Sequence, residues 1–538
     1  MHFFNRVWNT FDLNKEYDEF ELLETESGEP NLFSKGKKKN PYPKGVPTIE
    51  AQSGLEPNQE LTRNYDKNIK ILKDVFHASK NSDVVFREFK IASRVRACVI
   101  FMNGMTNANL IDDYILRQAM NILDIDAKHV TIDYLKENII SIAELSKLSQ
   151  LGEITYGILA GMAALLVEKQ DEVLMMDTRG FEHRSIAQPR AEKAIVGPHE
   201  AFVENLRTNI TMIRRVVQTP DLVCEFKHLG GENNVQVAIL HRDGITNARL
   251  LKEVEKKLAK INTRFAFGEG MTQQLIEDRK ASPIPQILNT ERPDRAGAML
   301  MSGHVVILFD YSPYCMILPA TFFSFMSAPD DSYLRKPFAD MMKLVRYAGL
   351  LASIFLPGIY VALLNYHPSI ISAELIDTIM ESRMMISVGV QYEMLFLMVV
   401  FQLVRECGVR VPGEMGQSLS VIAALVLGQA SVSANIVSSI MLIIVAITGL
   451  GNYCIPDVSL QMSATWVSIM LVAAASFGGL MLMSACVVVL LVYMCSIKSF
   501  GVPFFAPFAP KTFSNKRSFG SGFMQMENDG LDYTNEEG

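Results

Sequence analysis

The pattern of polar and apolar positions changes near Leu344 and divides the chain into two parts. Before this point, short apolar runs alternate with polar segments of helical periodicity, which is typical of an α/β fold. After it, long apolar runs are interrupted only by brief polar turns. We therefore expect an α/β soluble N-terminal region followed by an α-helical multi-span transmembrane domain.

Strand-like runs and a helix open the α/β part, and a hairpin follows them. The expected elements are strands at Val84–Ile91 and Arg96–Phe101, a helix at Asn109–Leu123, and hairpin arms at Met162–Val167 and Glu172–Met176. The hairpin ends at Asp177.

The same order of elements returns later in the chain. Val99–Leu110 aligns with Ile239–Leu250 so that Gly, Thr, Asn, Ala and Leu coincide in a shared G-x-T-N-A turn. A second expected hairpin has arms at Ala298–Met301 and His304–Phe309 and ends at Asp310. This repetition predicts two related subdomains. The turn lacks the spacing of a nucleotide-binding loop, so we expect its Thr and Asn to cap the following helix.

Five apolar segments after Leu344 are candidates to cross a membrane. They are Leu344–Tyr366, Ile386–Arg405, Gln417–Asn435, Ile436–Ile455 and Ala464–Met494, the last long enough to tilt or to break at Gly478-Gly479. Basic residues flank the first, second and last segments, and all of these favour the cytoplasm. They can share one side only if the number of crossings is even. One segment, Gln417–Asn435 or a neighbour, is then expected to be re-entrant or interfacial.

Two features of the helical part place polar groups at membrane depth. If Gln417–Asn435 is helical, small and polar residues form one stripe along it, which serves either close helix packing or a water-facing wall: Gln417, Ser420, Ala424, Gly428, Ser431 and Asn435. Glu393 lies inside the second expected span, where an idle carboxylate would cost about 2.5–3.5 kcal/mol. We therefore expect Glu393 to face water or a partner.

These patterns set the expected domain limits. They are a polar tail at 1–65, subdomains at 66–195 and 196–330, a transmembrane helical domain of four or five spans at 331–497, and a mobile tail at 498–538. On the helix expected at Val203–Val217, the basic residues Arg207, Arg214 and Arg215 indicate a solvated or salt-bridged face, with partner docking as the alternative. Residues 1–27 lack the apolar run of a signal peptide, so we expect the N-terminal region to be cytoplasmic.

Composition narrows the possible chemistry. The net charge of −7 over 538 residues gives no nucleic-acid footprint. The seven cysteines form no C-x-x-C motif and are expected to be buried thiols, with no metal and no cofactor. Because no nucleophile–base pair or phosphate loop stands out, we do not expect an enzyme.

Several short motifs carry a family resemblance when taken together. They are Arg179-Gly180-Phe181-Glu182, Gly197–Asn209, Arg214-Arg215 with Thr219-Pro220, Thr290–Asp294, Arg405–Pro412 running to Gly416-Gln417, and Gly428-Gln429-Ala430. From Asp66 to Lys498 the chain resembles the A subunit of bacterial spore germinant receptors, the GerA family.

The resemblance implies two thioredoxin-like subdomains and a membrane subunit in the spore inner membrane. It also implies that the chain acts with B and C partner subunits and contacts membrane lipid. It further implies a homo-oligomer that responds to nutrient germinants and forms an ion channel. Met398 and Gln402 stand where the family pattern has Glu, which leaves Glu393 and Glu406 as the acidic residues of that span. The alternatives are the related A-like stage V sporulation membrane protein, which amplifies ion release, and a secondary amino-acid transporter, which should show inverted repeats.

Overall fold

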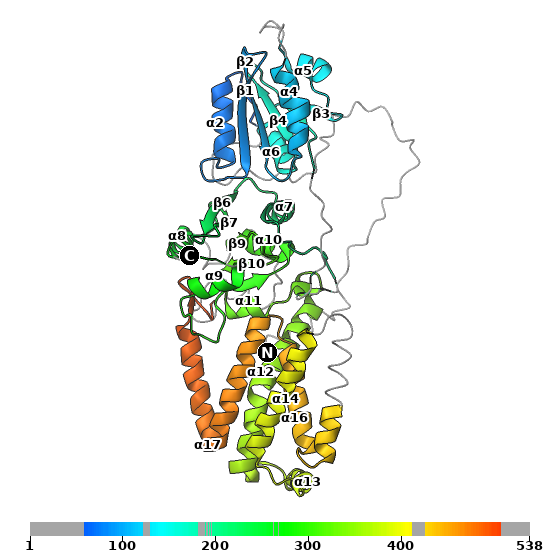
Figure 1. Cartoon of the computed structure of the whole chain (residues 1–538), viewed down its shortest axis with the longest axis vertical. Helices are drawn as coiled ribbons and strands as arrows, with labels where there is room; N and C mark the ends of the chain where they lie inside the picture. The colour runs from blue at the N-terminus through cyan, green and yellow to red at the C-terminus, as the bar shows by residue number, and fades with distance from the viewer. Residues whose placement is uncertain are drawn as a thin grey trace, which may run out of the picture. The chain divides into compact units, whose positions relative to one another are not determined.

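The computed structural model describes residues 59–121, 130–180, 189, 192, 194, 196–261, 263–266, 268–410 and 426–506, with 408–410 as backbone only. Within these residues, two α/β units precede a set of long helices (Figure 1).

The first unit is built on a five-stranded sheet whose neighbouring strands are all antiparallel. In spatial order the strands are β1 (Val84–Ile91), β2 (Val95–Met102), β4 (Ala163–Val167), β5 (Val173–Met176) and β3 (Leu145–Leu148). One face is covered by α2 (Tyr65–Val75) and α6 (Leu151–Leu159), and the other by α3 (Ala108–Ile111), the π-helical η2 (Asp112–Leu116), α4 (Arg117–Met120) and α5 (Ile132–Asn138). Because both faces are covered, the central strands are apolar along almost their whole length.

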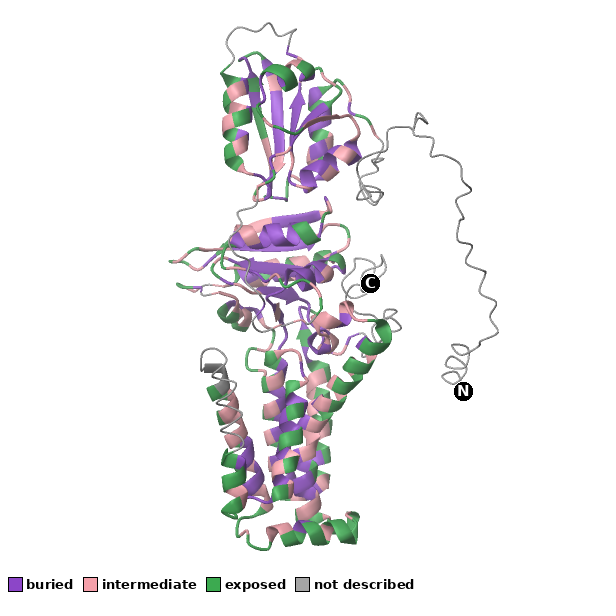
Figure 2. Cartoon of the chain, turned by 90° about the vertical axis from the view of Figure 1, so that its right-hand side faces the viewer, coloured by how far each residue is buried: buried purple, intermediate pink, exposed green. Residues whose placement is uncertain are grey.

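The second unit repeats this arrangement. Its strands are β6 (Leu222–Leu229), β7 (Val235–Arg242), β9 (Val305–Phe309), β10 (Cys315–Leu318) and β8 (Leu288–Thr290), again all antiparallel. Helices α7 (Leu206–Val216) and α10 (Pro293–Met301) cover one face, and α8 (Ala248–Ala259) and α9 (Gly268–Ile276) cover the other. The strand order matches that of the first unit position for position, as the repeated sequence pattern predicted. Figure 2 shows the strands of both sheets largely buried.

Two details of the predicted repeat are wrong. Ala298–Met301, expected as a hairpin arm, is the last part of helix α10, and the real hairpin pairs β9 with β10. A four-residue apolar run does not distinguish a strand from a buried helix turn, so periodicity could not decide. The implied thioredoxin-like βαβ unit would place two parallel strands in each sheet, whereas the described neighbouring strands are antiparallel throughout.

In the shared G-x-T-N-A turns the Asn side chains cap the following helix as expected, but the Thr side chains do not: Thr106 donates to the Met102 carbonyl and Thr246 accepts from the Arg242 backbone N–H. Gly104 and Gly244 have φ angles of 90° and 78°, which favour glycine. The side chains of Asn107 and Asn247 each accept a hydrogen bond from the backbone N–H two residues later, at 3.0 and 2.9 Å. Each turn therefore begins the helix that follows its sheet strand.

Long helices make up most of the remaining described chain. They are α12 (Lys336–Tyr366), α13 (Ala373–Arg383), α14 (Val390–Arg410), an unlabelled helix at 426–433, α16 (Ser439–Tyr453) and α17 (Val458–Ser496), with short 3₁₀ turns η3 (Pro329–Ser332) and η4 (Pro368–Ile370) and the small helix α11 (Phe322–Met326). Among the described helices, α12 and α17 are long and apolar enough to cross a membrane. Exposed residues run along much of these helices (Figure 2).

Helix α17 reverses direction at the expected glycine break. Gly479 has φ 61° and ψ −149°, a conformation that is essentially restricted to glycine. Leu460 near the start of α17 and Ile497 just after its end both join the apolar cluster of the second sheet. A Cβ on Gly479 would instead meet Tyr366, the last residue of α12. The helix is therefore an antiparallel pair of arms with both ends beside the second α/β unit (Figure 1).

The folded part of the chain extends beyond the expected domain limits at both ends. Leu61, assigned to the polar tail, is buried and donates a backbone hydrogen bond to Ser149. After α17, a small hairpin of β11 (Lys498–Ser499) and β12 (Val502–Pro503) leads to Phe504, which is fully buried in the second unit's core. Residues 498–506 thus belong to the folded structure rather than to a mobile tail.

A buried ionic cluster ties the second sheet to the start of α12. Arg292 is fully buried and donates two hydrogen bonds to the Asp294 carboxylate, at 3.0 and 2.7 Å. The Tyr333 hydroxyl donates to the same carboxylate at 2.6 Å. Burial alone would raise the pKa of Asp294, but these two partners hold it below its ordinary value. Asp331 then accepts from Arg346 of α12 at 2.6 Å.

Arg214 of α7 joins the two α/β units and is not on a solvated face. Its side chain is 2 % exposed and its Nε donates to Asp83 Oδ2 at 3.0 Å. A further hydrogen bond of 3.3 Å runs from its Nη2 to Asn81. Of the other two basic residues, Arg215 makes an exposed ion pair with Glu200. The sequence pattern could not distinguish the buried Arg214 from the exposed Arg215, because the ion-pair partner of Arg214 lies in the other α/β unit.

Replacing Arg214 by Met should loosen the contact between the units. The change leaves the Asp83 carboxylate buried without its cation, which costs about 3–5 kcal/mol. Hydrogen exchange measured by mass spectrometry should show this loss of protection in residues 77–83 and in α7. The matched control, Arg215→Met, removes an exposed pair and should cost less than about 1 kcal/mol. Equal effects of the two variants would show that the buried pair contributes little.

His77 is expected to make the contact between the two α/β units depend on pH. The Asp221 and Asp243 carboxylates raise the pKa of the His77 imidazole. Nε2 of the ring lies 3.9 Å from Asp221 Oδ1, and Nδ1 lies 3.3 Å from Asp243 Oδ2. A raised folded-state pKa adds stability below the unfolded value of about 6.5 and loses it as pH rises through the folded value. Hydrogen-exchange protection of residues 77–83, corrected for the intrinsic exchange rate, should therefore fall as pH rises from about 6.5 through the folded-state pKa of His77. His77→Gln should abolish that dependence, and a variant that retained it would assign the effect to another group.

Candidate functional site

Glu393 is the sequence-predicted site residue with the most definite surroundings. It lies in the first turn of α14 and is only 1 % exposed. One carboxylate oxygen pairs with the guanidinium of Arg383 at the end of α13. The other accepts a hydrogen bond of 2.6 Å from the backbone N–H of Ser438. The expectation that Glu393 would have a partner is met by these two groups.

The Ser438 contact places the carboxylate at the N-terminus of a helix. Ser438 is the N-cap of α16, and its hydroxyl accepts from the backbone N–H of Met441 at 3.2 Å. The unpaired N–H groups and the helix dipole make this end electropositive, which favours a carboxylate. Arg383 is fixed in turn by a 3.1 Å hydrogen bond to the carbonyl of Val388. The negative charge of Glu393 is thus balanced from two directions.

Tyr360 brings α12 to the same place. It is largely buried and packs in one apolar cluster with Met394 of α14 and Val437 beside the α16 cap. Its hydroxyl lies close enough to interact with the charges of Arg383 and Glu393. Four helices therefore meet around one carboxylate: α12, α13, α14 and α16.

The predicted small-residue stripe is only partly described. Gln417, Ser420 and Ala424 lie outside the described residues. Gly428 is buried in the helix at 426–433, and a Cβ there would stand 3.4 Å from Leu442 of α16. Ser431 is half-buried on the same helix. The described contact at Gly428 is one of close helix packing.

Asn435 is a helix cap and does not continue the stripe. It has φ 55°, and its backbone N–H bonds to the carbonyl of Val432 while that of Ile436 bonds to Ser431, both at 3.0 Å. This pattern is a Schellman motif with Asn in the left-handed position. The expected helix was therefore too long at its C-terminal end. An Asn just after an apolar helical pattern is the signal that could have placed the cap.

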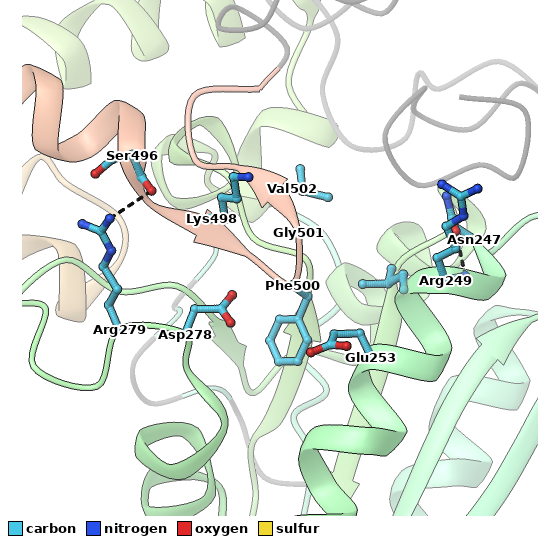
Figure 3. A pocket seen from close by; sticks show the side chains of 11 residues that line it. Asn247, Arg249, Glu253, Asp278, Arg279, Ser496, Lys498, Phe500, Gly501 and Val502 are labelled. Atoms are coloured by element: carbon cyan, nitrogen blue, oxygen red, sulfur yellow. Dashed lines mark hydrogen bonds between the residues drawn. The ribbon is translucent and has the colours of Figure 1, made fainter.

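An open pocket of about 660 Å³ lies beside the hairpin that follows α17 (Figure 3). Its walls come from α8, the loop after α9 and the C-terminal hairpin, and the Arg279 guanidinium donates to the Ser496 carbonyl at 3.3 Å. Both signs of charge line it: Arg249, Arg279 and Lys498 against Glu253 and Asp278. A mixed lining of this kind does not select an anion or a cation by charge.

The described cysteines are free, and three of them are buried as expected. Burial raises the pKa of Cys98 to about 12 and also raises those of Cys224 and Cys315, so these thiols stay protonated. Cys407 and Cys495 are exposed, against expectation. In the described parts of the chain, no three His, Cys, Asp or Glu residues are grouped so that they could hold a metal ion.

Comparison with known proteins gives relatives over most of the chain. It is 32 % identical over 432 residues to Spore germination protein KA of Bacillus subtilis (strain 168), which covers 80 % of this chain and 79 % of that one. It is 30 % identical over 452 residues to Spore germination protein GerLA of Bacillus cereus, covering 84 % and 91 %. Uncharacterized membrane protein YfkQ of Bacillus subtilis (strain 168) is also 30 % identical, covering 85 % and 88 %.

A solved structure and a family model complete the comparison. The crystal structure of the N-terminal domain of the A subunit of the Bacillus megaterium spore germinant receptor GerK3 is 26 % identical, with a TM-score of 0.37, and covers 49 % of this chain and 98 % of that one. The model described as Bacillus/Clostridium GerA spore germination protein matches residues 70–528, which include both α/β units and the long helices. The chain therefore belongs to the GerA family of spore germination proteins.

Proposed function

We propose that this chain is the A subunit of a spore germinant receptor. In this proposal it is a non-enzymatic sensor-transducer that needs no cofactor. It sits in the spore inner membrane with B and C subunits, assembles as a homo-oligomer, and passes ions when nutrient germinants arrive. The observation that carries the proposal is the family match across residues 70–528. That match includes the helices that would have to form any membrane pathway.

The arrangement of the helix ends supports a single cytoplasmic side. Arg346 near the start of α12 and Lys498 after α17 both lie beside the second α/β unit, through Asp331 and through the C-terminal hairpin. Arg405 of α14 donates to Gln461 in the first turns of α17 at 2.8 Å, which places it at the same end. Basic residues favour the cytoplasm, so we assign this end and both α/β units to that side. The reversal at Gly479 lets α17 contribute two of the crossings.

Cysteine labelling in membranes tests this orientation. On a background without the native cysteines, Met481→Cys at the tip of α17 should react with a membrane-impermeant thiol reagent added from outside. The second arm of α17, from the glycine break to the end of the helix, has a length within the ~17–25 residues needed to cross a membrane. Lys498→Cys follows the far end of that arm and should therefore react only after the membrane is permeabilised. Labelling of both positions from the same side would contradict two crossings by α17.

Paired variants separate the structural role of Glu393 from a role in ion flow. Glu393→Gln alone leaves Arg383 nearly buried and unpaired, a loss of about 3–5 kcal/mol that should lower the protein level in spores. Glu393→Gln with Arg383→Gln should restore the level. If the carboxylate serves ion flow, germinant-triggered ion release should remain impaired in the double variant. Normal release there would limit Glu393 to a structural role. Glu381→Gln on the exposed surface of α13 is the matched control.

A deletion strain distinguishes the receptor from its alternatives. Loss of this chain should abolish ion release in response to one set of nutrient germinants and leave the response to others intact. An amplifier of the stage V sporulation type would reduce ion release after every germinant. A secondary amino-acid transporter would instead change uptake of its substrate in growing cells, with normal germination. Either of the last two results would overturn the receptor proposal.

A further inference from the structure

A small, partly open cavity lies inside the helical bundle, apart from the Glu393 site. Its volume is about 30 Å³, and it is bounded by α12, α14, α16 and α17. Six of its lining residues are polar, although the surroundings are apolar helices: Ser353, Gln402, Thr448, Asn452, Thr465 and Ser468. Buried polar groups in such a setting need partners, because an unpaired one costs about 1–3 kcal/mol.

Most of the hydroxyl groups that line the cavity have already donated their hydrogen. Each of three bonds to a carbonyl of its own helix, three or four residues earlier: Ser353 to Leu350 at 2.9 Å, Thr448 to Ile444 at 2.8 Å, and Thr465 to Gln461 at 3.0 Å. What these side chains still offer is the lone pairs of their oxygen atoms. They can therefore accept a hydrogen bond or ligate a cation.

Asn452 has a defined orientation that leaves its oxygen unpartnered. Its Nδ2 donates to Thr465 Oγ1 at 2.8 Å. Because the Thr465 hydroxyl hydrogen already goes to Gln461, the Thr465 oxygen acts as an acceptor and the amide nitrogen of Asn452 must face it. The Asn452 Oδ1 atom then has no hydrogen-bond partner among the described groups, although the residue is only 7 % exposed.

Ser468 adds a second unpartnered oxygen to the same cavity. The residue is 1 % exposed, and its hydroxyl makes no hydrogen bond to any described atom. Two buried oxygens from α16 and α17 thus lie without a protein partner around one small space that both of them line. This is the arrangement expected when a bound species supplies the missing contacts.

The lining selects the kind of species. A cavity of about 30 Å³ has room for a ligand about the size of one or two water molecules and not for a larger one. A water molecule has two hydrogens to donate, whereas a cation can be ligated by all of the surrounding oxygens at once. The lining contains hydroxyl and amide oxygens and no carboxylate. Divalent ions are usually bound with the help of carboxylates, so the neutral oxygen set favours an ion of single charge.

We propose that this cavity binds one monovalent cation of the sodium or potassium class, ligated by Asn452 Oδ1 and Ser468 Oγ with help from the neighbouring hydroxyl oxygens. The bound ion joins α12, α14, α16 and α17 at a point where each contributes a lining residue. Occupancy by the ion thereby stabilises the packing of the four helices. The proposal is independent of the receptor function, since it concerns binding to the chain itself.

Thermal unfolding of the purified full-length chain in detergent tests this binding. The unfolding temperature should rise in a saturable way with NaCl or KCl, relative to N-methyl-D-glucamine chloride at equal ionic strength, because a ligand that binds only the folded state stabilises it. Ser468→Ala removes one ligand oxygen and should weaken the apparent affinity for the cation at least tenfold. Ser484→Ala is the matched control on α17, since its hydroxyl is exposed and bonds to Met481 of its own helix.

A charge variant separates a cation from a water molecule. Asn452→Asp keeps the shape of the side chain and adds a negative charge, so a cation site should gain at least tenfold in apparent affinity. A cavity that holds only water should give a variant that is destabilised equally in all three salts. Identical unfolding of the wild-type chain in the three salts, or an unchanged salt response in Ser468→Ala, would overturn the proposal. Should Asn452→Asp fail to fold, Ser468→Ala against Ser484→Ala still decides it.

Discussion

The fold depends on pairing buried charges: among the described residues, Arg214, Arg292 and Arg295 are buried and each lies beside a carboxylate. Arg292 shows this most clearly, because its guanidinium has no exposed surface and an isolated charge in such a place would cost several kcal/mol. Asp294 provides a two-point contact, and the carbonyl of Pro198 accepts another hydrogen bond at 3.1 Å. Neighbouring Arg295 pairs with Glu192. Residues Thr290–Asp294 and the neighbouring Arg295 therefore determine how the second sheet packs against the segment containing Glu192 and Pro198 and against the residues that lead into α12.

The same constraint appears wherever separate parts of the chain meet. Arg214 and Asp83 lie 131 residues apart and join the two α/β units. Glu393 gathers α13 and the N-terminus of α16 around α14. Such pairs add little net stability compared with a well-packed apolar contact, yet removing one partner is expensive. They therefore penalise wrong arrangements more than they reward the right one.

Glycines set the geometry of the helical part. At Gly451 a Cβ would come within 2.5 Å of the Gly349 carbonyl oxygen, so α12 and α16 can touch backbone to backbone only because both residues lack side chains. Gly479 permits the reversal of α17, which brings Ile497 and Phe504 back to the core that Leu460 already occupies. The apolar core of the second sheet thus continues into the helices.

Local pattern was enough for much of this fold, and packing decided the rest. The limits of β1 at Val84 and Ile91, the capping roles of Asn107 and Asn247, and the repeated element order follow from alternation and turn chemistry, which act between residues close in sequence. The break at Gly478-Gly479 was visible as well, but not the direction taken after it. No sequence period encodes that Arg214 is buried against Asp83, that Glu393 faces the cap of α16, or that Asn452 and Ser468 share one cavity. These facts depend on which helix and sheet faces come together, and that is settled by the balance of burial and charge pairing over the whole folded chain.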